Sequence, residues 1–211
     1  FQKLMTKNHP RAGGIPKPED LDKVNLDRSM QIYKERFANA GDFTFFFVGS
    51  FNEDSIKPLI EKYIGSLPTL PKKETFKDLG IRPPVGMVKK EINKGSDQKS
   101  MVAMVFNTPA PYSAKEALSL NSLAEIMSIK LIEQLREEKG GVYGVSAYAN
   151  FSRTPVSAAS FTITFPCSPD NVDTLRKAVI EELQKIIKEG VSAEDLEKIK
   201  EQQKRKLEVD S

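Results

Sequence analysis

The chain has 211 residues, of which 39% are hydrophobic and 29% are charged, a composition typical of one or two globular domains. Its net charge of +3 comes from basic residues spread among acidic ones. The densest basic run, Lys198–Lys206, is interleaved with glutamates, which indicates a solvated helix face and argues against a nucleic-acid-binding stripe. No segment approaches the ~20 apolar residues of a transmembrane helix.

Two helices are predicted in the first third of the chain. One ends near residue 40 and the other covers about residues 53–64, and each begins after a residue whose short polar side chain can accept a hydrogen bond from the first helical turn. These candidate caps are Asp20 or Asn25 for the first helix and Asn52 or Asp54 for the second. We therefore expect a helix, a connection and a second helix before residue 70.

The connection between these helices is aromatic. Residues 43–48 read Phe-Thr-Phe-Phe-Phe-Val, which predicts a strand buried on both faces. After Leu67-Pro68, the segment up to Pro84 contains several prolines and a charged stretch, as linkers between domains do. We place one domain at residues 1–70, a linker at 71–85 and a second domain at 86–211.

The second domain is predicted to contain four strands and three helices. Residues 99–107 are apolar at both alternating sets of positions, which predicts a central strand, and the short connection around residue 154 predicts antiparallel pairing. The predicted strands are 85–92, 99–107, 142–151 and 157–165, and the predicted helices are 113–138, 172–189 and a last one that Ser192 begins. This order predicts an α+β fold, an antiparallel sheet with helices packed on one face.

The chemistry is concentrated where the long helix ends. Arg136 lies in its last turn, Gly140 and Gly141 stop it, and Tyr143 and Gly144 follow at the start of an extended segment. Such an element can direct a fixed cation and a phenol at one bound group. In contrast, the chain has one histidine and one cysteine, too few for a metal cluster or a conventional nucleophile and base.

Each of these residues also has a structural explanation. Arg136 would stabilise a helix C-terminus through the dipole alone, and Tyr143 would pack on a sheet face as tyrosines in strands do. Against the first explanation, Glu137 and Glu138 share the last turn, where acidic groups are unfavourable. Gly144 is where a substrate or a neighbouring backbone would come close.

Other polar residues have weaker claims to a function. Ser146, Tyr148 and Asn150 share one face of the predicted strand and either line a binding surface or face solvent. His9 precedes a proline without a second ligand nearby, so we interpret it as a loop histidine. Cys167 ends a strand with no neighbour that would activate it, and we interpret it as structural.

Three segments, in their order and spacing, resemble one protein family. The first runs from Tyr33 through Phe47-Val48-Gly49-Ser50 to Gly65-Ser66-Leu67-Pro68, the second is Leu131–Tyr143 with its Leu-Arg-Glu and Gly…Tyr elements, and the third is Gly190–Leu196. Together they are similar to the pitrilysin (insulinase) type of zinc metallopeptidase, and the resemblance covers nearly the whole chain. It implies a fold of repeated α/β-roll domains, with residues 1–70 ending one domain and 86–211 forming most of the next.

The resemblance also implies a function and a division of labour. Zinc sits in another domain of this family, on a His-x-x-Glu-His helix that this sequence lacks, so zinc is implied for the parent protein and none for this chain. Arg136 and Tyr143, together with Gly140, Gly141 and Gly144, are implied to contact a peptide substrate, with Tyr143 stabilising the oxyanion. The implied partners are that peptide and the N-terminal zinc-bearing half or a sister subunit.

Two alternatives stay open within the same family. The chain is also consistent with a metal-free partner subunit, or with a structural subunit, although a scaffold has no use for the Arg136 and Tyr143 pair. Phe1 to Met5 show neither a signal-peptide core nor an initiator methionine, and the last predicted helix still runs at Ser211. We therefore expect a piece of a longer protein, and the long relatives in this family imply a bacterial periplasm or cell envelope.

Overall fold

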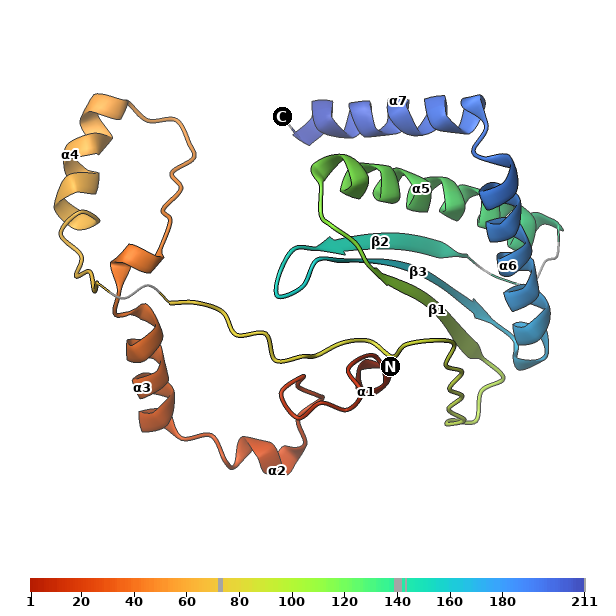
Figure 1. The fold of residues 1–211 in the computed structure, drawn as a ribbon, viewed down its shortest axis with the longest axis horizontal. Coiled ribbons are helices and arrows are strands. Elements are labelled where there is room, and N and C mark those ends of the chain that lie inside the picture. The colour runs from red at the N-terminus through yellow and green to blue at the C-terminus, as the bar shows by residue number, and fades with distance from the viewer. Residues whose placement is uncertain (72–73, 139–141, 143, 211) are drawn as a thin grey trace. The chain divides into compact units, whose positions relative to one another are not determined.

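The structure, a computed structural model, describes residues 1–71, 74–138, 142 and 144–210, with only the backbone of residues 136–138 and 210. The chain divides into two units, Phe1–Pro84 and Val85–Ser211 (Figure 1).

Short helices make up the regular structure of the first unit. They are α1 Gln2–Met5, α2 Pro18–Leu21, α3 Leu26–Phe37, the 3-10 turn η1 Ala40–Asp42 and α4 Glu53–Tyr63. The side chain of Asn25 accepts a hydrogen bond from the Arg28 amide at 2.8 Å, and that of Asn52 accepts one from the Ser55 amide at 3.0 Å. Both longer helices were predicted, and of the alternative caps the structure uses the two asparagines.

The predicted strand Phe43–Val48 is wrong for this structure. The segment is extended but pairs with no strand in the described part of the chain, and its side chains are exposed, Phe46 to 84% and Val48 to 97%. A strand needs neighbours for its amides and carbonyls, and within residues 1–71 and 74–84 only Asn39 is buried. The segment is apolar, as its sequence indicates, but the described residues of this unit form neither a sheet nor a core that would bury it.

The second unit is built on a three-stranded antiparallel sheet of β1 Ser100–Pro109, β2 Ser146–Ser152 and β3 Ala158–Cys167. Its order is β1-β3-β2, and the turn around residue 154 joins β2 to β3 antiparallel, as predicted. The predicted central position of β1 is wrong, because β3 lies between the other two strands.

The position of β1 follows from the segment before it. The predicted strand 85–92 is not formed, since Gly86 adopts a left-handed φ of 78° and Val85 is 91% exposed. With no partner from that segment in the described residues, one side of β1 is an edge. The strand buries Val102 and Met104 partly against the core, whereas Met101 on the alternate set stays exposed.

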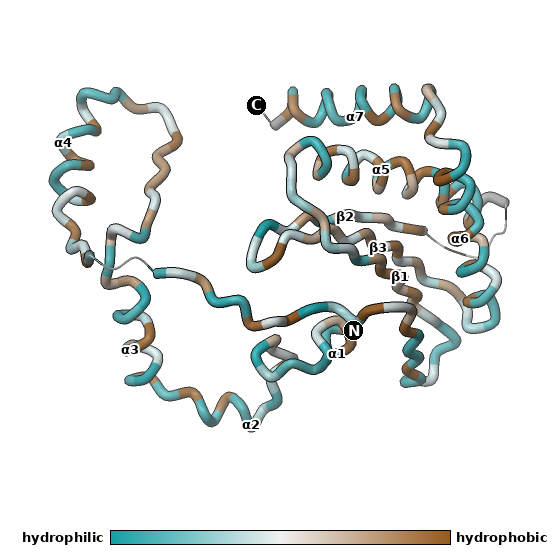
Figure 2. The backbone as a smooth tube through the Cα atoms, viewed as in Figure 1, coloured by the Kyte–Doolittle hydropathy of each residue, from teal (hydrophilic) through white to brown (hydrophobic). Residues whose placement is uncertain are grey.

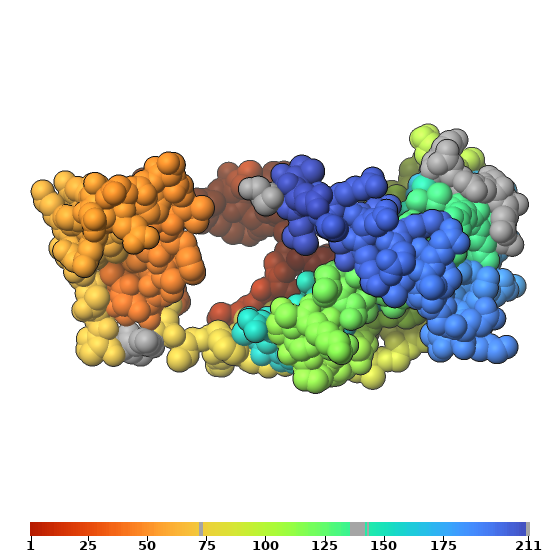
Figure 3. All heavy atoms as spheres, turned by 90° about the horizontal axis from the view of Figure 1, so that it is seen from above, coloured from red at the N-terminus to blue at the C-terminus, as the bar shows by residue number. Residues whose placement is uncertain are grey.

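The helices of the second unit cover one face of this sheet (Figure 1). They are α5 Ala114–Ile132, continued by the π-helix η2 Glu133–Glu138, then the 3-10 turn η3 Pro169–Asn171, α6 Val172–Glu189 and α7 Ala193–Asp210. In space-filling view the blue atoms of α7 lie against the green atoms of α5 (Figure 3). This arrangement confirms the predicted α+β class.

The core lies between α5, α6 and the strands. One apolar stripe runs along α5 and into η2: Met127, Leu131 and Leu135 are fully buried, and they belong to one cluster with Ile163 and Phe165 of β3. Apolar positions run along the strands and along α5 (Figure 2). Burying a leucine or phenylalanine side chain contributes about 1.5–3 kcal/mol, so this cluster is the main source of stability in the second unit.

An ion pair connects α7 with α5. Lys130 Nζ lies 3.0 Å from Asp195 Oδ2, and Ser192 both donates its hydroxyl to Asp195 at 2.5 Å and accepts from the Asp195 amide at 3.1 Å. Ser192 therefore begins the last helix, as predicted. The Ser192 hydroxyl first, and then Lys130, lower the pKa of Asp195 below its ordinary 3.8.

We expect Asp195→Asn to lower the free energy of unfolding of the chain by about 1–3 kcal/mol at pH 7, since it removes charge-assisted hydrogen bonds. A carboxyl group with a lowered folded pKa contributes stability above its unfolded pKa and loses that contribution as the pH falls through the folded value. The difference between wild type and variant should therefore shrink below about pH 4. Urea unfolding followed by circular dichroism at pH 7 and at about pH 3 measures this difference. A difference as large at the lower pH as at pH 7 would contradict the stabilising role of the ionised Asp195.

Candidate functional site

The end of α5 holds the first candidate residue. The sequence predicted a regular helix to residue 138. In the structure, α5 ends at Ile132 and continues as the π-helix Glu133–Glu138, a rare form that often occurs at functional sites. Leu135 within it is fully buried. The next residue is Arg136, whose backbone is thus fixed beside a core anchor; its side chain lies outside the described residues.

The chain returns to the core shortly afterwards. Val142 forms a bridge with Cys167 at the end of β3, and both are buried, as is Val145. The candidates Gly140, Gly141 and Tyr143 lie outside the described residues. Three described residues near the candidates are therefore buried in the core: Leu135 directly before Arg136, Val142 directly before Tyr143, and Val145 directly after Gly144.

The space around Gly144 does not require a glycine at this position. A β-carbon built at this position meets no described atom within 4 Å, and its φ is not in the left-handed region. The expectation of a close backbone approach within the chain is therefore not supported among the described residues. Substrate approach from outside stays a prediction.

On the face of the sheet opposite the helices, β2 is polar. Ser146, Tyr148 and Asn150 of β2 lie on it, and each is exposed. Their partners in register on β3 are Thr164, Thr162 and Ser160. Thr162 is buried, whereas Ser160 and Thr164 are half-buried beside the exposed residues of β2. The exposed hydroxyl and amide groups of β2 can form hydrogen bonds with a polar ligand such as a peptide backbone.

At Ala147, the backbone groups on the outer edge of β2 already form hydrogen bonds within the chain, a contact that the sequence did not predict. The Ser128 hydroxyl of α5 accepts a hydrogen bond from the Ala147 amide at 2.8 Å and lies 3.1 Å from the Ala147 carbonyl oxygen. Because an edge strand must offer such groups to an added strand, β2 cannot extend the sheet at Ala147. The only sequence signal was a serine inside an apolar helix stretch, next to Met127.

The two remaining candidates behave as structural residues. Burial raises the pKa of the Cys167 thiol, which disfavours the reactive thiolate. His9 Nδ1 accepts a hydrogen bond from the Arg11 amide at 3.1 Å, as a loop histidine does. In the described part of the chain no three histidine, cysteine or acidic residues come together as metal ligands, and none of its helices is long and apolar enough to cross a membrane.

The chain is similar in sequence to a known protein family and to proteins named as zinc proteases. A family model described as "Peptidase M16 inactive domain" matches residues 23–203. The chain is 25% identical over 200 residues to a "Zinc protease PQQL-like" of Arabidopsis thaliana, covering 88% of this chain and 21% of that protein. It is 26% identical over 178 residues to a "Probable zinc protease PqqL" of Haemophilus influenzae, covering 84% and 19%.

Solved structures share the fold. The crystal structure of the periplasmic protease PqqL from Escherichia coli matches with a TM-score of 0.75 and 19% identity, over 99% of this chain and 23% of that one. The chain therefore spans about a fifth of the length of the curated relatives that it matches.

Proposed function

This chain belongs to the peptidase M16 inactive-domain family, and on that premise we propose that it is the substrate-binding, non-catalytic part of a zinc-dependent metalloendopeptidase. The names of its relatives as zinc proteases support the reaction class. The described residues do not fit a zinc site. We assign the metal and the general base to another part of the parent protein or to a sister subunit.

The observation that supports the proposal is the burial of the described residues directly before Arg136 and Tyr143. Leu135 and Val142 are both buried in the core, and in our proposal they hold the two contact residues in position before a substrate arrives. Such preorganisation is what makes hydrogen-bond donors effective in catalysis. In our proposal the Arg136 guanidinium donates to a peptide carbonyl, and the Tyr143 phenol donates to the oxyanion that forms at the scissile carbonyl.

We also propose the place of the chain in its parent. Residues 1–70 would end one α/β-roll domain, residues 71–85 would link it to the next, and residues 86–211 would form most of that next domain. The division of the chain between Pro84 and Val85 falls within the proposed linker. For the parent we propose a periplasmic location, which the periplasmic PqqL of Escherichia coli supports.

Arg136 offers a test that separates binding from stability. In the full-length parent, Arg136→Lys keeps a cation at the helix end but loses the planar fork of donors. We expect kcat/KM for an internally quenched fluorescent peptide to fall about 10- to 100-fold, the equivalent of a charge-assisted hydrogen bond, with an unchanged unfolding midpoint. Full activity in Arg136→Lys, with a lowered midpoint in Arg136→Ala, would show that Arg136 serves the helix alone.

A further inference from the structure

A pocket of about 280 Å³ lies where α6 passes into α7 beside α5 (Figure 1). All three helices line it: α5 contributes Ile126 and Lys130, α6 contributes Glu182 and Ile186, and α7 contributes Asp195. The wall therefore combines apolar side chains with a few charged groups, as ligand pockets do. Its volume is suited to a small molecule or to a single long side chain.

Glu182 is the unexpected residue in this pocket. It continues the buried stripe of α6 formed by Leu175, Ala178 and Val179, where packing favours an apolar side chain. The residue is 7% exposed, and its carboxylate forms no hydrogen bond or ion pair within the described part of the chain. Burying a carboxylate without a partner is costly, and a residue that departs from the packing rule in this way marks a functional position.

The half-buried lysine in the wall does not pair with Glu182. Lys130 Nζ lies 3.0 Å from Asp195 Oδ2, and the pKa of Lys130 is raised chiefly by that hydrogen bond and least by the charge of Glu182. Lys185 and Glu189, which also line the pocket, are both exposed and carry opposite charges. Two buried carboxylates therefore face a single ammonium group, which leaves an excess of negative charge in the pocket.

We propose that this pocket binds a guanidinium group on a short aliphatic stem, with the Glu182 carboxylate as its acceptor. A guanidinium supplies the missing positive charge, donates two parallel hydrogen bonds to a carboxylate and is weakly hydrated. Ile126 and Ile186 provide apolar surface for the stem. A metal ion fits less well, because no three histidine, cysteine or acidic side chains of the described residues come together as ligands.

Two sources can supply this group: a free small molecule, or an arginine side chain from the part of the parent polypeptide outside residues 1–211. The chemistry that Glu182 recognises is the same for both. The inference does not depend on Arg136 or Tyr143, so its failure would leave the proposed function untouched.

A chemical-shift titration of the ¹⁵N-labelled 211-residue chain with propylguanidinium chloride tests the proposal. We expect saturable shifts centred on the amides of residues 189–192, with a Kd on the order of 1 mM, as suits so small a ligand. N-Propylurea, which has the same shape without the charge, should bind at least about 10-fold more weakly. The absence of saturable shifts, or equal affinity for the two compounds, would overturn the proposal without recourse to any variant.

A pair of matched variants locates the acceptor. Glu182→Gln keeps the size of the side chain and removes its charge, so binding of propylguanidinium should weaken at least about 10-fold. Glu181→Gln makes the same change at an exposed residue of α6 outside the pocket and should keep the affinity of the wild type. Circular dichroism verifies that both variants are folded. Unchanged affinity in Glu182→Gln would contradict the assignment of Glu182.

The full-length parent distinguishes the two sources. Saturation-transfer difference spectra that show the parent binding propylguanidinium would identify the ligand as a free molecule. If only the 211-residue chain binds, an arginine of the parent fills the pocket, and Glu182→Gln should lower the unfolding midpoint of the parent because it breaks a buried ion pair. A parent that neither binds the probe nor loses stability in Glu182→Gln would overturn the proposal.

Discussion

Replacing Tyr143 with phenylalanine in the full-length parent is expected to lower kcat for peptide hydrolysis about 100- to 1000-fold. This is the loss, about 3–4 kcal/mol of barrier, that follows the removal of one donor to a developing oxyanion. The change deletes a single hydroxyl group and keeps the ring. Because the proposed contact exists in the transition state and not in the ground state, kcat should fall more than KM rises.

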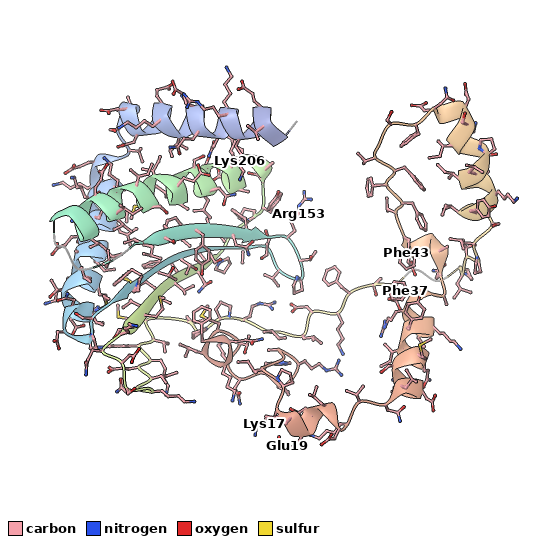
Figure 4. All side chains as sticks on the ribbon, turned by 180° about the vertical axis from the view of Figure 1, so that it is seen from behind. Lys17, Glu19, Phe37, Phe43, Arg153 and Lys206 are labelled. Carbon is pink, nitrogen blue, oxygen red and sulfur yellow. The ribbon has the colours of Figure 1, made fainter. Side chains whose placement is uncertain are left out.

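The matched control is Tyr112→Phe. Tyr112 packs edge-on against Phe151 at 5.5 Å and beneath the Arg153 guanidinium at 4.3 Å. Arg153 lies at the turn between β2 and β3 (Figure 4). Its role is carried by the ring, which phenylalanine retains, so activity should stay close to wild type. Steady-state rates with a quenched fluorescent peptide give both results. If Tyr143→Phe also keeps its activity within a factor of about two, Tyr143 is a packing residue and the substrate contact must be assigned elsewhere.

The sequence predicted the longer helices and the antiparallel pairing of β2 with β3 well, and the pairing of more distant strands poorly, for a physical reason. The backbone hydrogen bonds of α3 and α4, and the caps formed by the asparagines that begin them, join residues only a few positions apart. The local sequence pattern is therefore enough to predict these helices. Whether Phe43–Val48 or residues 85–92 form strands depends on distant partners that no local pattern specifies. β1 is apolar at both alternating sets of positions, which predicted a central strand, but it lies at the edge of the described sheet because residues 85–92 form no strand beside it.

The same limit applies to the candidate site. The roles of Arg136 and Tyr143 were implied by resemblance. The closure of the β2 edge by Ser128 joins residues 19 positions apart, and it emerges only once α5 is packed on the sheet. A polar face of β2 was foreseen from alternation, whereas its continuation onto β3 required the register.

The second large effect concerns the core. Phe165 of β3 is fully buried, and it pairs in register with Val102 of β1. We expect Phe165→Ala to lower the free energy of unfolding of the 211-residue chain by about 3–5 kcal/mol, because it removes a buried ring and leaves a cavity that the close-packed core fills only in part. Urea unfolding followed by circular dichroism measures the loss.

Phe106→Ala is the matched control for this variant, because it makes the same chemical change on the same sheet at a residue that is 41% exposed. Its cost should be about 1 kcal/mol, in line with the smaller apolar area that it exposes. Equal losses in the two variants would mean that the core is not centred on β3. The comparison also bears on the site, since Phe165 lies two residues from Cys167, which anchors Val142. A weakened core should therefore loosen the segment that carries Tyr143, so Phe165→Ala should reduce activity and stability together, whereas Tyr143→Phe should reduce activity alone.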